Sequence, residues 1–233
     1  MGAHFITGTG TDIGKTWLAC ALLRHWRAEG RRVAAFKPVL SGFDALHPQA
    51  SDAGALLEAL GREANTAELD TIAPWRFAAP LSPDMAAAHE GRSIDFEQLV
   101  NFSRQAVAAP ERPLLIEGVG GVMVPLDGRH TVRDWIAASG LPCVLVAGSY
   151  LGSLSHALTA LDALQRVGAG VTAIAVNESP GSPVSLDATL ESLSRHAAGV
   201  SLVGIARGDP QPDVTRLAGL LCPNPFRPYT APP

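Results

Sequence analysis

Cysteine is scarce in this sequence, and its placement argues against a disulfide framework. Three occur among 233 residues, at Cys20, Cys143 and Cys222, which is an odd number with wide separations. Cys20 and Cys143 lie in apolar surroundings, so we expect them to be small core residues of a protein from a reducing compartment. The seven histidines are equally scattered and have no spacing typical of metal ligands. We therefore expect a cytoplasmic protein without a Cys/His metal centre.

An excess of positive charge is also absent. The formal net charge is −4 and the sequence pI is about 5.9, which gives no support for binding to nucleic acid or to an anionic membrane. The N-terminus lacks a basic segment followed by a long apolar one, so we expect no signal peptide. There are no internal repeats, and 47% of the residues are hydrophobic. We expect a single α/β domain over residues 1–233.

One segment without charged side chains is long enough to cross a bilayer. It runs from Trp135 to Leu161 and contains no Asp, Glu, Lys or Arg. Glycines, a proline and serines interrupt it, and these favour a buried strand at Cys143–Ala147, a turn and then an amphipathic helix. We therefore expect no membrane span here.

Continuous apolar runs alternate with helical patterns along the chain. The runs predict strands covered on both faces, and they are Ala3–Ile6, Val33–Phe36, Leu114–Ile116, Cys143–Ala147, Val171–Val176 and Leu202–Ile205. The predicted helices are Thr16–Glu29, Ser51–Leu60, Phe96–Ala108, Val132–Ala138, Leu154–Val167 and Leu186–His196. Gly30, Gly140 and Gly168 follow three of these as expected left-handed caps. The alternation predicts a doubly wound, mostly parallel α/β sheet with ligands at the carboxyl ends of its strands.

Two parts of the chain fit this alternation poorly. Residues 43–92 are the least regular and place Pro74, Pro80 and Pro83 in loop-like surroundings. We expect them to form an excursion over the strand ends that covers a substrate. Residues 223–233 are rich in proline, so we expect an extended or frayed tail.

A glycine-rich loop between the first strand and the first helix predicts nucleotide binding. It reads Thr7-Gly8-Thr9-Gly10-Thr11-Asp12-Ile13-Gly14-Lys15-Thr16. Glycines let backbone N–H groups approach phosphate oxygens, and the helix N-terminus adds partial positive charge. Lys15 can neutralise the β- and γ-phosphates, and the Thr16 hydroxyl can coordinate Mg²⁺. Gly8 lies one residue earlier than in the common form of this loop, so a plain glycine turn before a lysine is the alternative.

Polar residues follow three predicted strands at the edge that carries this loop. Lys37 follows the second strand, Glu117-Gly118-Val119-Gly120-Gly121 the third and Asn177 the fifth. Lys37 can converge with Lys15 on a transferring phosphoryl group, although a lysine can also simply extend out of a strand end.

Carboxylates near this edge are candidate Mg²⁺ ligands. Glu117 ends an apolar strand before a glycine-rich turn, as does the second acidic motif of nucleotide hydrolases. Asp52 could bind the ion as well, or Ser51-Asp52 could merely cap the following helix. The residues alone leave both roles of Asp52 open.

Together these motifs resemble the dethiobiotin synthetase family. They occur in order from the N-terminus to about Asn177: the glycine-rich loop, Lys37-Pro38-Val39-Leu40-Ser41-Gly42, Ser51-Asp52, Ile116-Glu117-Gly118-Val119-Gly120-Gly121, Leu151-Gly152-Ser153-Leu154-Ser155-His156-Ala157 and Val176-Asn177. The resemblance implies a P-loop NTPase fold and a ligase. In this family CO₂ adds to one amine of 7,8-diaminononanoate, ATP phosphorylates the carbamate, and the second amine closes a cyclic urea.

The resemblance also implies roles for residues at matching positions. Lys15 and Lys37 would be catalytic, and Thr16, Asp52 and Glu117 would hold Mg²⁺. Residues implied to bind the nucleotide and its metal are Asp12, Ile13, Gly14, Lys15, Thr16, Trp17, Asp52, Glu117, Gly118, Val119, Gly120 and Asn177. Residues implied to bind the other substrates are Thr11, Ser41, Gly121, Gly152, Ser153, Leu154 and Ser155. The family site lies at a homodimer interface, where the helix beginning near Gly152 would receive the substrate carboxylate of the neighbouring subunit.

The sequence departs from the family pattern at two segments. Asp84 stands where histidine is common in Leu81-Ser82-Pro83-Asp84. We expect Ile205-Ala206-Arg207-Gly208 to replace the family's adenine-side loop, with Ala206 where proline is usual. A tyrosine that helps to bind the substrate carboxylate has no clear counterpart beyond Asn177. Recognition of the carboxylate and of the base is therefore the least determined part of the site.

Two other functions remain to be weighed. Partitioning or septum-positioning ATPases share the fold, but they commonly carry an additional lysine early in the phosphate loop, and Thr9, Gly10 and Thr11 offer none. ATP-dependent amidoligases need an ammonia source, usually a glutaminase domain, for which 233 residues leave no room.

Overall fold

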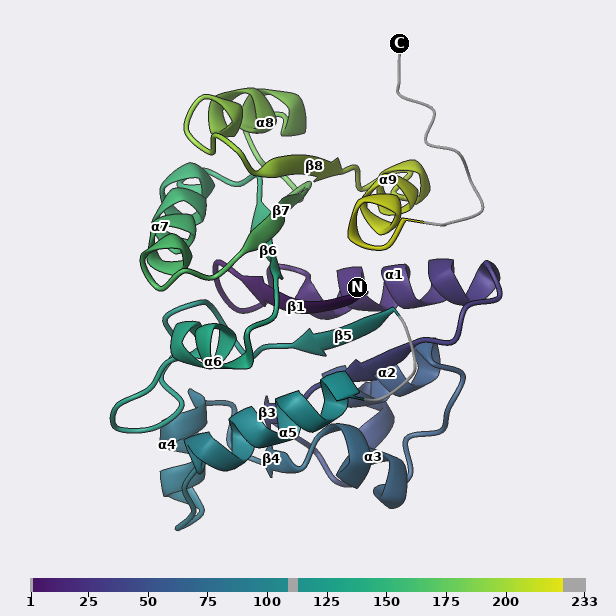
Figure 1. The fold of residues 1–233 in the computed structure, drawn as a ribbon, viewed down its shortest axis with the longest axis vertical. Helices are drawn as coiled ribbons and strands as arrows, with labels where there is room; N and C mark the ends of the chain where they lie inside the picture. The colour runs from purple at the N-terminus through teal and green to yellow at the C-terminus, as the bar shows by residue number, and fades with distance from the viewer. Residues whose placement is uncertain (1, 109–112, 224–233) are drawn as a thin grey trace.

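A six-stranded parallel sheet forms the centre of the molecule (Figure 1). The structure is a computed structural model that describes residues 2–108 and 113–223. The strand order is β2-β5-β1-β6-β7-β8, and every neighbouring pair is parallel. The strands are β1 (Ala3–Gly8), β2 (Ala34–Phe36), β5 (Leu114–Glu117), β6 (Cys143–Gly148), β7 (Val171–Asn177) and β8 (Ser201–Ile205).

Alternate residues of each central strand belong to opposite cores. In β1, Phe5 contributes to one core and Ile6 to the other, and both are fully buried. Phe5 packs edge-on against Trp135, whose indole N–H donates to the Ser103 hydroxyl at 2.8 Å. The continuous apolar runs therefore reflect burial of the sheet on both faces.

Helices cover both faces of the sheet. One core contains residues of α1 (Lys15–Ala28), α2 (Asp52–Ala59), α3 (Thr66–Ile72) and α9 (Gln211–Leu221). The other contains residues of α4 (Pro83–His89), α5 (Phe96–Ala108), α6 (Val132–Ser139), α7 (Ser153–Arg166) and α8 (Leu186–Ser194). Figure 1 shows α1 and α9 on one side of the sheet and α6, α7 and α8 on the other. The doubly wound α/β fold is thus confirmed.

The predicted elements agree with the structure to within a few residues at their ends. Gly30, Gly140 and Gly168 have φ angles of 76°, 67° and 70°, so all three adopt the predicted left-handed conformation. The uncharged segment from Trp135 to Leu161 folds into most of α6, then β6 and the first part of α7. Within the described ranges, no helix is both long and apolar enough to span a bilayer.

Residues 43–92 are more regular than the sequence suggested. They contain α2, α3, α4 and a short 3₁₀ helix at Pro48–Ala50, and β4 (Trp75–Phe77) pairs in parallel with β3 (Val39–Ser41) in a second sheet. The expectation that Pro83 lies in a loop is wrong, because it begins α4, where a missing N–H leaves no helical hydrogen bond unmade. The structure also adds α9, which was not predicted; most of the predicted tail, residues 224–233, lies outside the described residues.

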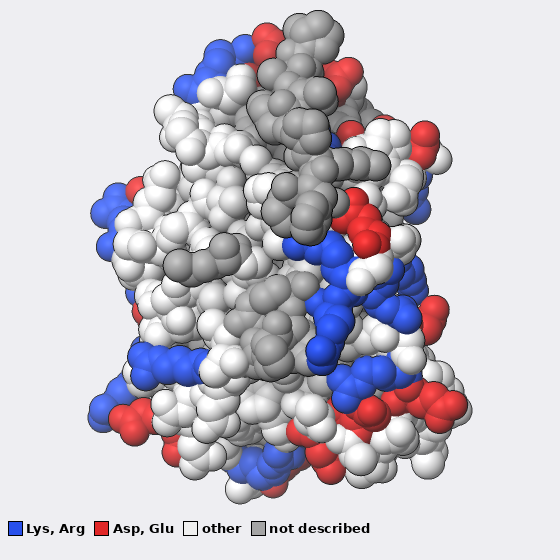
Figure 2. All heavy atoms as spheres, turned by 45° about the vertical axis from the view of Figure 1, so that its right-hand side comes forward, with Lys and Arg blue, Asp and Glu red and all other residues white. Residues whose placement is uncertain are grey.

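Charged side chains on the face shown in Figure 2 are of both signs and lie beside one another. Ion pairs at the surface of the molecule include Arg24 with Glu58 at 3.2 Å and Arg92 with Glu90 at 2.9 Å. Such exposed pairs contribute little to stability. Their mixture on this face fits the modest net charge of −4.

Candidate active site

The phosphate loop connects β1 to α1 through left-handed backbone. Asp12 and Gly14 have φ angles of 56° and 91°, and Gly14 is the N-cap of α1. A Cβ atom at Gly14 would lie 2.4 Å from Asn177 Nδ2, so only glycine leaves room for that amide. Successive N–H groups in such a turn, followed by a helix N-terminus, form a concave site for phosphate. The predicted loop therefore has the required shape.

Lys15 is folded back over this loop. Its ammonium donates to the carbonyl of Gly10 at 2.7 Å, and the residue is 6% exposed. Burial, followed by repulsion from the nearby Lys37, lowers the pKa of Lys15 from 10.5 to about 8. A bound phosphate would place negative charge beside the Lys15 ammonium, which here donates to a neutral carbonyl.

Lys37 lies directly after β2 and is held between two carboxylates. Its ammonium donates to Glu117 Oε1 at 2.6 Å, to Asp52 Oδ2 at 3.0 Å and to the carbonyl of Gly118 at 2.8 Å. Lys37 is 2% exposed and Glu117 is 1% exposed. Burial alone would lower the pKa of Lys37, but attraction to Glu117 and Asp52 raises it above its ordinary value. The group stays a fixed cation rather than merely extending into solvent from a strand end.

Asp52 begins α2, but it does not cap that helix. Ser51 is the N-cap, and its hydroxyl accepts a hydrogen bond from the N–H of Gly54 at 3.1 Å. The Asp52 carboxylate instead faces Lys37. Burial opposes ionisation of Asp52, yet Lys37 and smaller contributions from Thr16 and Lys15 lower its pKa. The local sequence left two roles open, and the structure assigns the cap to Ser51.

The expected Mg²⁺ ligands are gathered at one point. The Thr16 hydroxyl donates to Glu117 Oε1 at 2.6 Å, and Lys37 bridges Glu117 and Asp52. Glu117 Oε2 is buried without a hydrogen-bond partner, which leaves an oxygen available to a cation. No cluster of three or more His, Cys, Asp or Glu side chains suited to a metal occurs in residues 2–108 and 113–223. A hydroxyl, two carboxylates and phosphate oxygens nevertheless fit the preference of Mg²⁺ for oxygen.

A cavity of about 710 Å³ adjoins Lys15, Thr16, Lys37 and Asp52. Ser41 lines it, and the hydroxyl of Ser41 is buried without a partner. Apolar side chains form much of the remaining wall: Leu40, Pro80, Leu81, Pro83, Val119 and Val124. The cavity thus combines a charged end with walls suited to an aliphatic chain.

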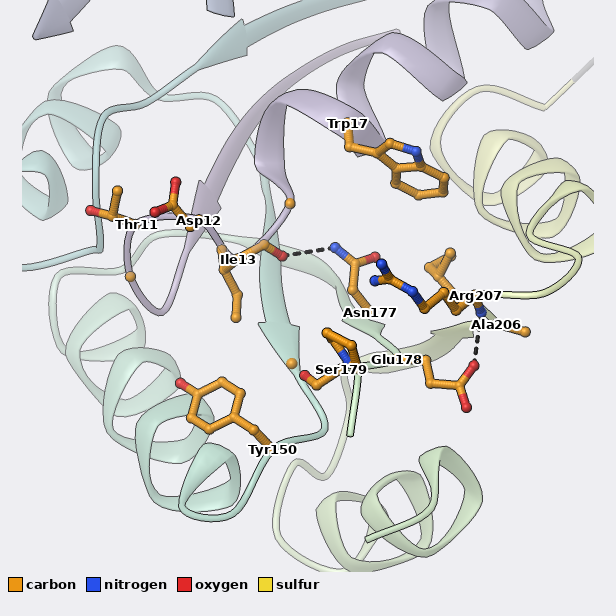
Figure 3. A pocket seen from close by; sticks show the side chains of 15 residues that line it. Thr11, Asp12, Ile13, Trp17, Tyr150, Asn177, Glu178, Ser179, Ala206 and Arg207 are labelled. Atoms are coloured by element: carbon orange, nitrogen blue, oxygen red, sulfur yellow. Dashed lines mark hydrogen bonds between the residues drawn. The ribbon is translucent and has the colours of Figure 1, made fainter. Parts of the chain in front are cut away.

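A second cavity of about 780 Å³ lies toward the ends of β6, β7 and β8 (Figure 3). Asn177 donates through Nδ2 to the carbonyl of Ile13 at 2.8 Å, whereas its Oδ1 is buried without a partner. The two cavities share Thr11, Asp12, Gly14 and Trp17 as lining residues. They therefore meet at the phosphate loop.

Most predicted site residues line one of these cavities, and a few do not. Gly118 contacts Lys37 through its carbonyl, and a Cβ atom on Gly121 would lie 3.1 Å from the carbonyl oxygen of Thr9. Gly152, Ser153, Leu154 and Ser155 cap and begin α7 but line neither cavity, so their role stays a prediction.

Several lining residues were not predicted as part of the site. They are Leu40, Pro80, Leu81, Ser82, Pro83, Val124, Gly148, Tyr150, Glu178, Ser179 and Pro180. Ile205, Ala206 and Arg207, which belong to the segment expected to replace the family's adenine-side loop, line the second cavity. Asp84, which replaces the usual family histidine, accepts a hydrogen bond from the Ser82 hydroxyl at 2.6 Å.

Comparison with known proteins identifies close sequence relatives. A family model described as an AAA domain matches residues 3–212. An ATP-dependent dethiobiotin synthetase BioD of Acidiphilium cryptum is 50% identical over 197 residues, which cover 84% of this chain and 88% of the relative. The protein of the same name from Methylobacterium nodulans is 46% identical, with 89% of this chain and 94% of the relative covered.

Solved structures with the same fold are more distant in sequence. A MinC:MinD cell division protein complex of Aquifex aeolicus matches with a TM-score of 0.55 at 14% identity, covering 99% of this chain and 100% of that chain. HypB of Helicobacter pylori in complex with nickel matches with a TM-score of 0.53 at 12% identity, covering 95% and 85%. These similarities support the fold alone.

Proposed function

The chain belongs to the dethiobiotin synthetase family, and we propose that it forms dethiobiotin from 7,8-diaminononanoate, CO₂ and ATP, releasing ADP and phosphate. The Lys37 ammonium, held by Glu117 and Asp52 beside the phosphate loop, is the observation that carries this proposal. It is a preorganised positive charge at the place where a phosphoryl group would be transferred. The enzyme is accordingly an ATP-dependent ligase.

The proposed reaction has three steps. One amine adds to CO₂ and loses a proton, which gives a carbamate. A carbamate oxygen attacks the γ-phosphorus of ATP, and ADP leaves. The second amine attacks the carbonyl carbon of the resulting carbamic–phosphoric anhydride, loses a proton and expels phosphate as the ring closes. Lys15 and Lys37 would stabilise the charge that develops on the phosphoryl and carbamate oxygens.

The cavity beside Lys37 would hold the diamine. Its apolar walls fit the aliphatic chain, and the unpartnered Ser41 hydroxyl could hydrogen-bond to the carbamate or to an amine. Lys37 is too enclosed by protein atoms to be well solvated, which favours strong electrostatic stabilisation by its ammonium.

We propose Mg²⁺ as the cofactor, held by Thr16, Asp52 and Glu117. All three offer oxygen atoms, and the free Oε2 of Glu117 supports this assignment. The bound ion would neutralise charge on the β- and γ-phosphate oxygens. Because Mg²⁺ retains several water molecules, this small number of protein ligands is ordinary for the ion.

Asn177 is proposed to read the edge of the adenine. Since its Nδ2 is committed to the Ile13 carbonyl, the atom left for a ligand is the acceptor Oδ1. An acceptor at this place favours adenine, which carries an amino group at C6, over guanine, which carries a carbonyl oxygen at C6. Selectivity for ATP over GTP follows.

We further propose a cytoplasmic homodimer with the site near its interface. Leu151 is 79% exposed directly before the cap of α7, and burial against a second subunit would remove this apolar side chain from water. In that arrangement, N–H groups at the start of α7 (Ser153, Leu154 and Ser155) would bind the substrate carboxylate. The free cysteines fit a reducing compartment, and burial raises the pKa of the Cys20 and Cys143 thiols to about 12.

Phosphate release tests the proposed function directly. The protein is incubated with Mg²⁺-ATP and isotopically labelled bicarbonate, with and without 7,8-diaminononanoate, and the product is analysed by mass. We expect release that depends on the diamine and a cyclic urea that carries the label. Hydrolysis independent of the diamine would instead indicate a switch ATPase, and the absence of turnover would contradict the proposal.

A further inference from the structure

The small sheet of β3 and β4 forms one wall of the cavity of about 710 Å³. β3 provides Leu40 and Ser41, and the chain after β4 provides residues 80–83. The Ser41 hydroxyl in this wall is buried without a hydrogen-bond partner. A buried hydroxyl without a partner costs free energy. The wall therefore presents a polar group that a ligand in the cavity can pair.

The position of Ser41 depends on β4. The two strands are parallel, with Ser41 opposite Phe77. The pairing continues beyond both strands, since the N–H of Gly42 donates to the carbonyl of Ala79 at 3.0 Å and that of Phe43 donates to the carbonyl of Phe77 at 2.9 Å. In the described part of the chain this sheet has no third strand, and two paired strands are only marginally stable by themselves. β4 therefore needs support from side chains.

Two side chains that follow α4 supply such support. The Cζ atom of Arg92 lies 4.6 Å from the ring centroid of Phe77, and its Nη1 donates to the carbonyl of Arg76 at 2.9 Å. The same nitrogen donates to Glu90 Oε2 at 2.9 Å. Glu90 Oε1 in turn accepts a hydrogen bond from the N–H of Ala78 at 2.7 Å. Arg92 and Glu90 together thus hold three successive residues at the end of β4.

This ion pair differs from an ordinary surface pair because both of its members also bind backbone. Arg195, the C-cap of α8, pairs with Glu191 one turn earlier at 3.0 Å and offers a comparison far along the chain. An exposed ion pair by itself contributes little to stability. A guanidinium fixed over an aromatic ring and bonded to a carbonyl instead restricts geometry. We therefore look for the effect of Arg92 and Glu90 in the shape of the cavity wall.

We propose that Arg92 and Glu90 form a brace that positions the Ser41 hydroxyl for the carbamate or an amine of the substrate. Both are positioning residues, because neither lines the two cavities and both act through β4. The proposal rests on the proposed function, since it takes the diamine as the occupant of the cavity beside Ser41. Loss of one neutral hydrogen bond corresponds to a loss of roughly two- to tenfold.

Steady-state kinetics with the diamine varied at saturating Mg²⁺-ATP tests the brace. The variants are Arg92→Ala, Glu90→Ala and Glu90→Gln, with Arg195→Ala as the matched control. We expect kcat/KM for the diamine to fall roughly two- to tenfold in Arg92→Ala and Glu90→Ala and to stay at the wild-type value in Arg195→Ala. Glu90→Gln should lose less than Glu90→Ala, because its amide oxygen still accepts from the N–H of Ala78. The affinity for ADP, measured by calorimetry, should stay unchanged in all four variants.

A double-mutant cycle with Ser41→Ala separates positioning from a general structural effect. If Arg92 acts through the Ser41 hydroxyl, Arg92→Ala should lower kcat/KM much less in the Ser41→Ala background than in the wild type. Full additivity of the two losses would overturn the brace, and so would an unchanged kcat/KM in Arg92→Ala; both outcomes leave the proposed function intact. A wild-type protein without turnover that depends on the diamine would overturn both proposals.

Amide hydrogen exchange provides a measurement that needs no turnover. The N–H groups of Gly42 and Phe43 should exchange faster in Arg92→Ala than in the wild type, and Arg195→Ala should leave them unchanged. Thermal denaturation shows whether each variant is folded. If Arg92→Ala does not fold, Arg92→Lys takes its place, since lysine keeps the charge but not the flat guanidinium, and it should show a smaller effect of the same kind. Unchanged exchange at both amides in a folded Arg92 variant would overturn the brace.

Discussion

Lysine amino groups report directly on the phosphate-binding end of this protein, because the chain contains only two lysines, Lys15 and Lys37. Both are buried and lie in the site, but their surroundings differ. Lys37 has two carboxylate partners, and these raise its pKa. Lys15 donates to a neutral carbonyl, and burial together with Lys37 lowers its pKa to about 8. We predict that the two ammonium groups titrate far apart in the nucleotide-free protein.

The size of this difference can be worked out from the structure. A fall from 10.5 to about 8 corresponds to about 3 kcal/mol that favours the neutral form of Lys15. Because its pKa is lower when folded than when unfolded, the unfolded chain holds more protons between these values. The free energy of unfolding should therefore rise as the pH increases from about 8 to 10.5. The full destabilisation of about 3 kcal/mol from the charged, buried Lys15 is present below about pH 8.

Nucleotide binding should raise the pKa of Lys15 again. Phosphate oxygens beside Lys15 favour its charged form, so ADP binding near pH 8 should take up a proton. The affinity for ADP should fall by up to roughly tenfold for each pH unit above about 8, as the free protein loses the proton that the complex needs. Calorimetry in two buffers with different ionisation enthalpies measures this uptake.

Selective isotopic labelling of lysine makes the titration visible by NMR. The ε-methylene groups should give two signals, and Lys15→Met removes one of them and so assigns both. We expect one signal to titrate near pH 8 in the free protein and to move to higher pH with ADP. If both signals titrate together near 10.5 without nucleotide, the reasoning from burial is refuted.

Three further predictions concern the carboxylates and the loop. Lys37→Ala should lower turnover about a hundredfold or more, because the charge that stabilises the phosphoryl group is lost. It should also lower the free energy of unfolding by about 3 kcal/mol, because Glu117 is left buried without its partner. Steady-state kinetics and thermal denaturation measure the two effects, and near-normal turnover would remove Lys37 from the mechanism. Asp52→Asn should raise the Mg²⁺ concentration needed for half-maximal activity. Ser51→Ala should lower the free energy of unfolding by about 1 kcal/mol and leave that Mg²⁺ concentration unchanged. The same Mg²⁺ requirement in both variants would argue against Asp52 as a ligand. Gly14→Ala should abolish measurable ADP binding, since its Cβ atom would meet Asn177 and its φ angle is 91°, while Gly170→Ala, with nothing within 4 Å of the new atom, should bind normally.

Fold and function are determined by different parts of this molecule. The MinC:MinD complex shares the fold at 14% identity, so the architecture by itself does not distinguish a ligase from a cell division protein. Relatives at 46–50% identity carry the name dethiobiotin synthetase. We therefore base the proposed function on residues at the strand ends, such as the ion-paired Lys37 and Glu117.

The second sheet and α4 show where local patterns were too weak to predict structure. β3 and β4 have three residues each, and such short strands have no measurable period. Pro83 suggested a loop, but proline is equally suited to the first turn of a helix. Only packing against the main core selects between these conformations.

The sequence alone determined the features that depend on near neighbours along the chain. Apolar runs predicted the parallel sheet because its strands are buried on both faces, and the glycines and Lys15 predicted the phosphate loop because left-handed turns and a helix N-terminus are local. The tertiary structure decided which distant groups meet: Lys37 with Glu117, 80 residues apart, and Asn177 with Ile13, 164 residues apart. Those contacts depend on the strand order, which no local pattern encodes.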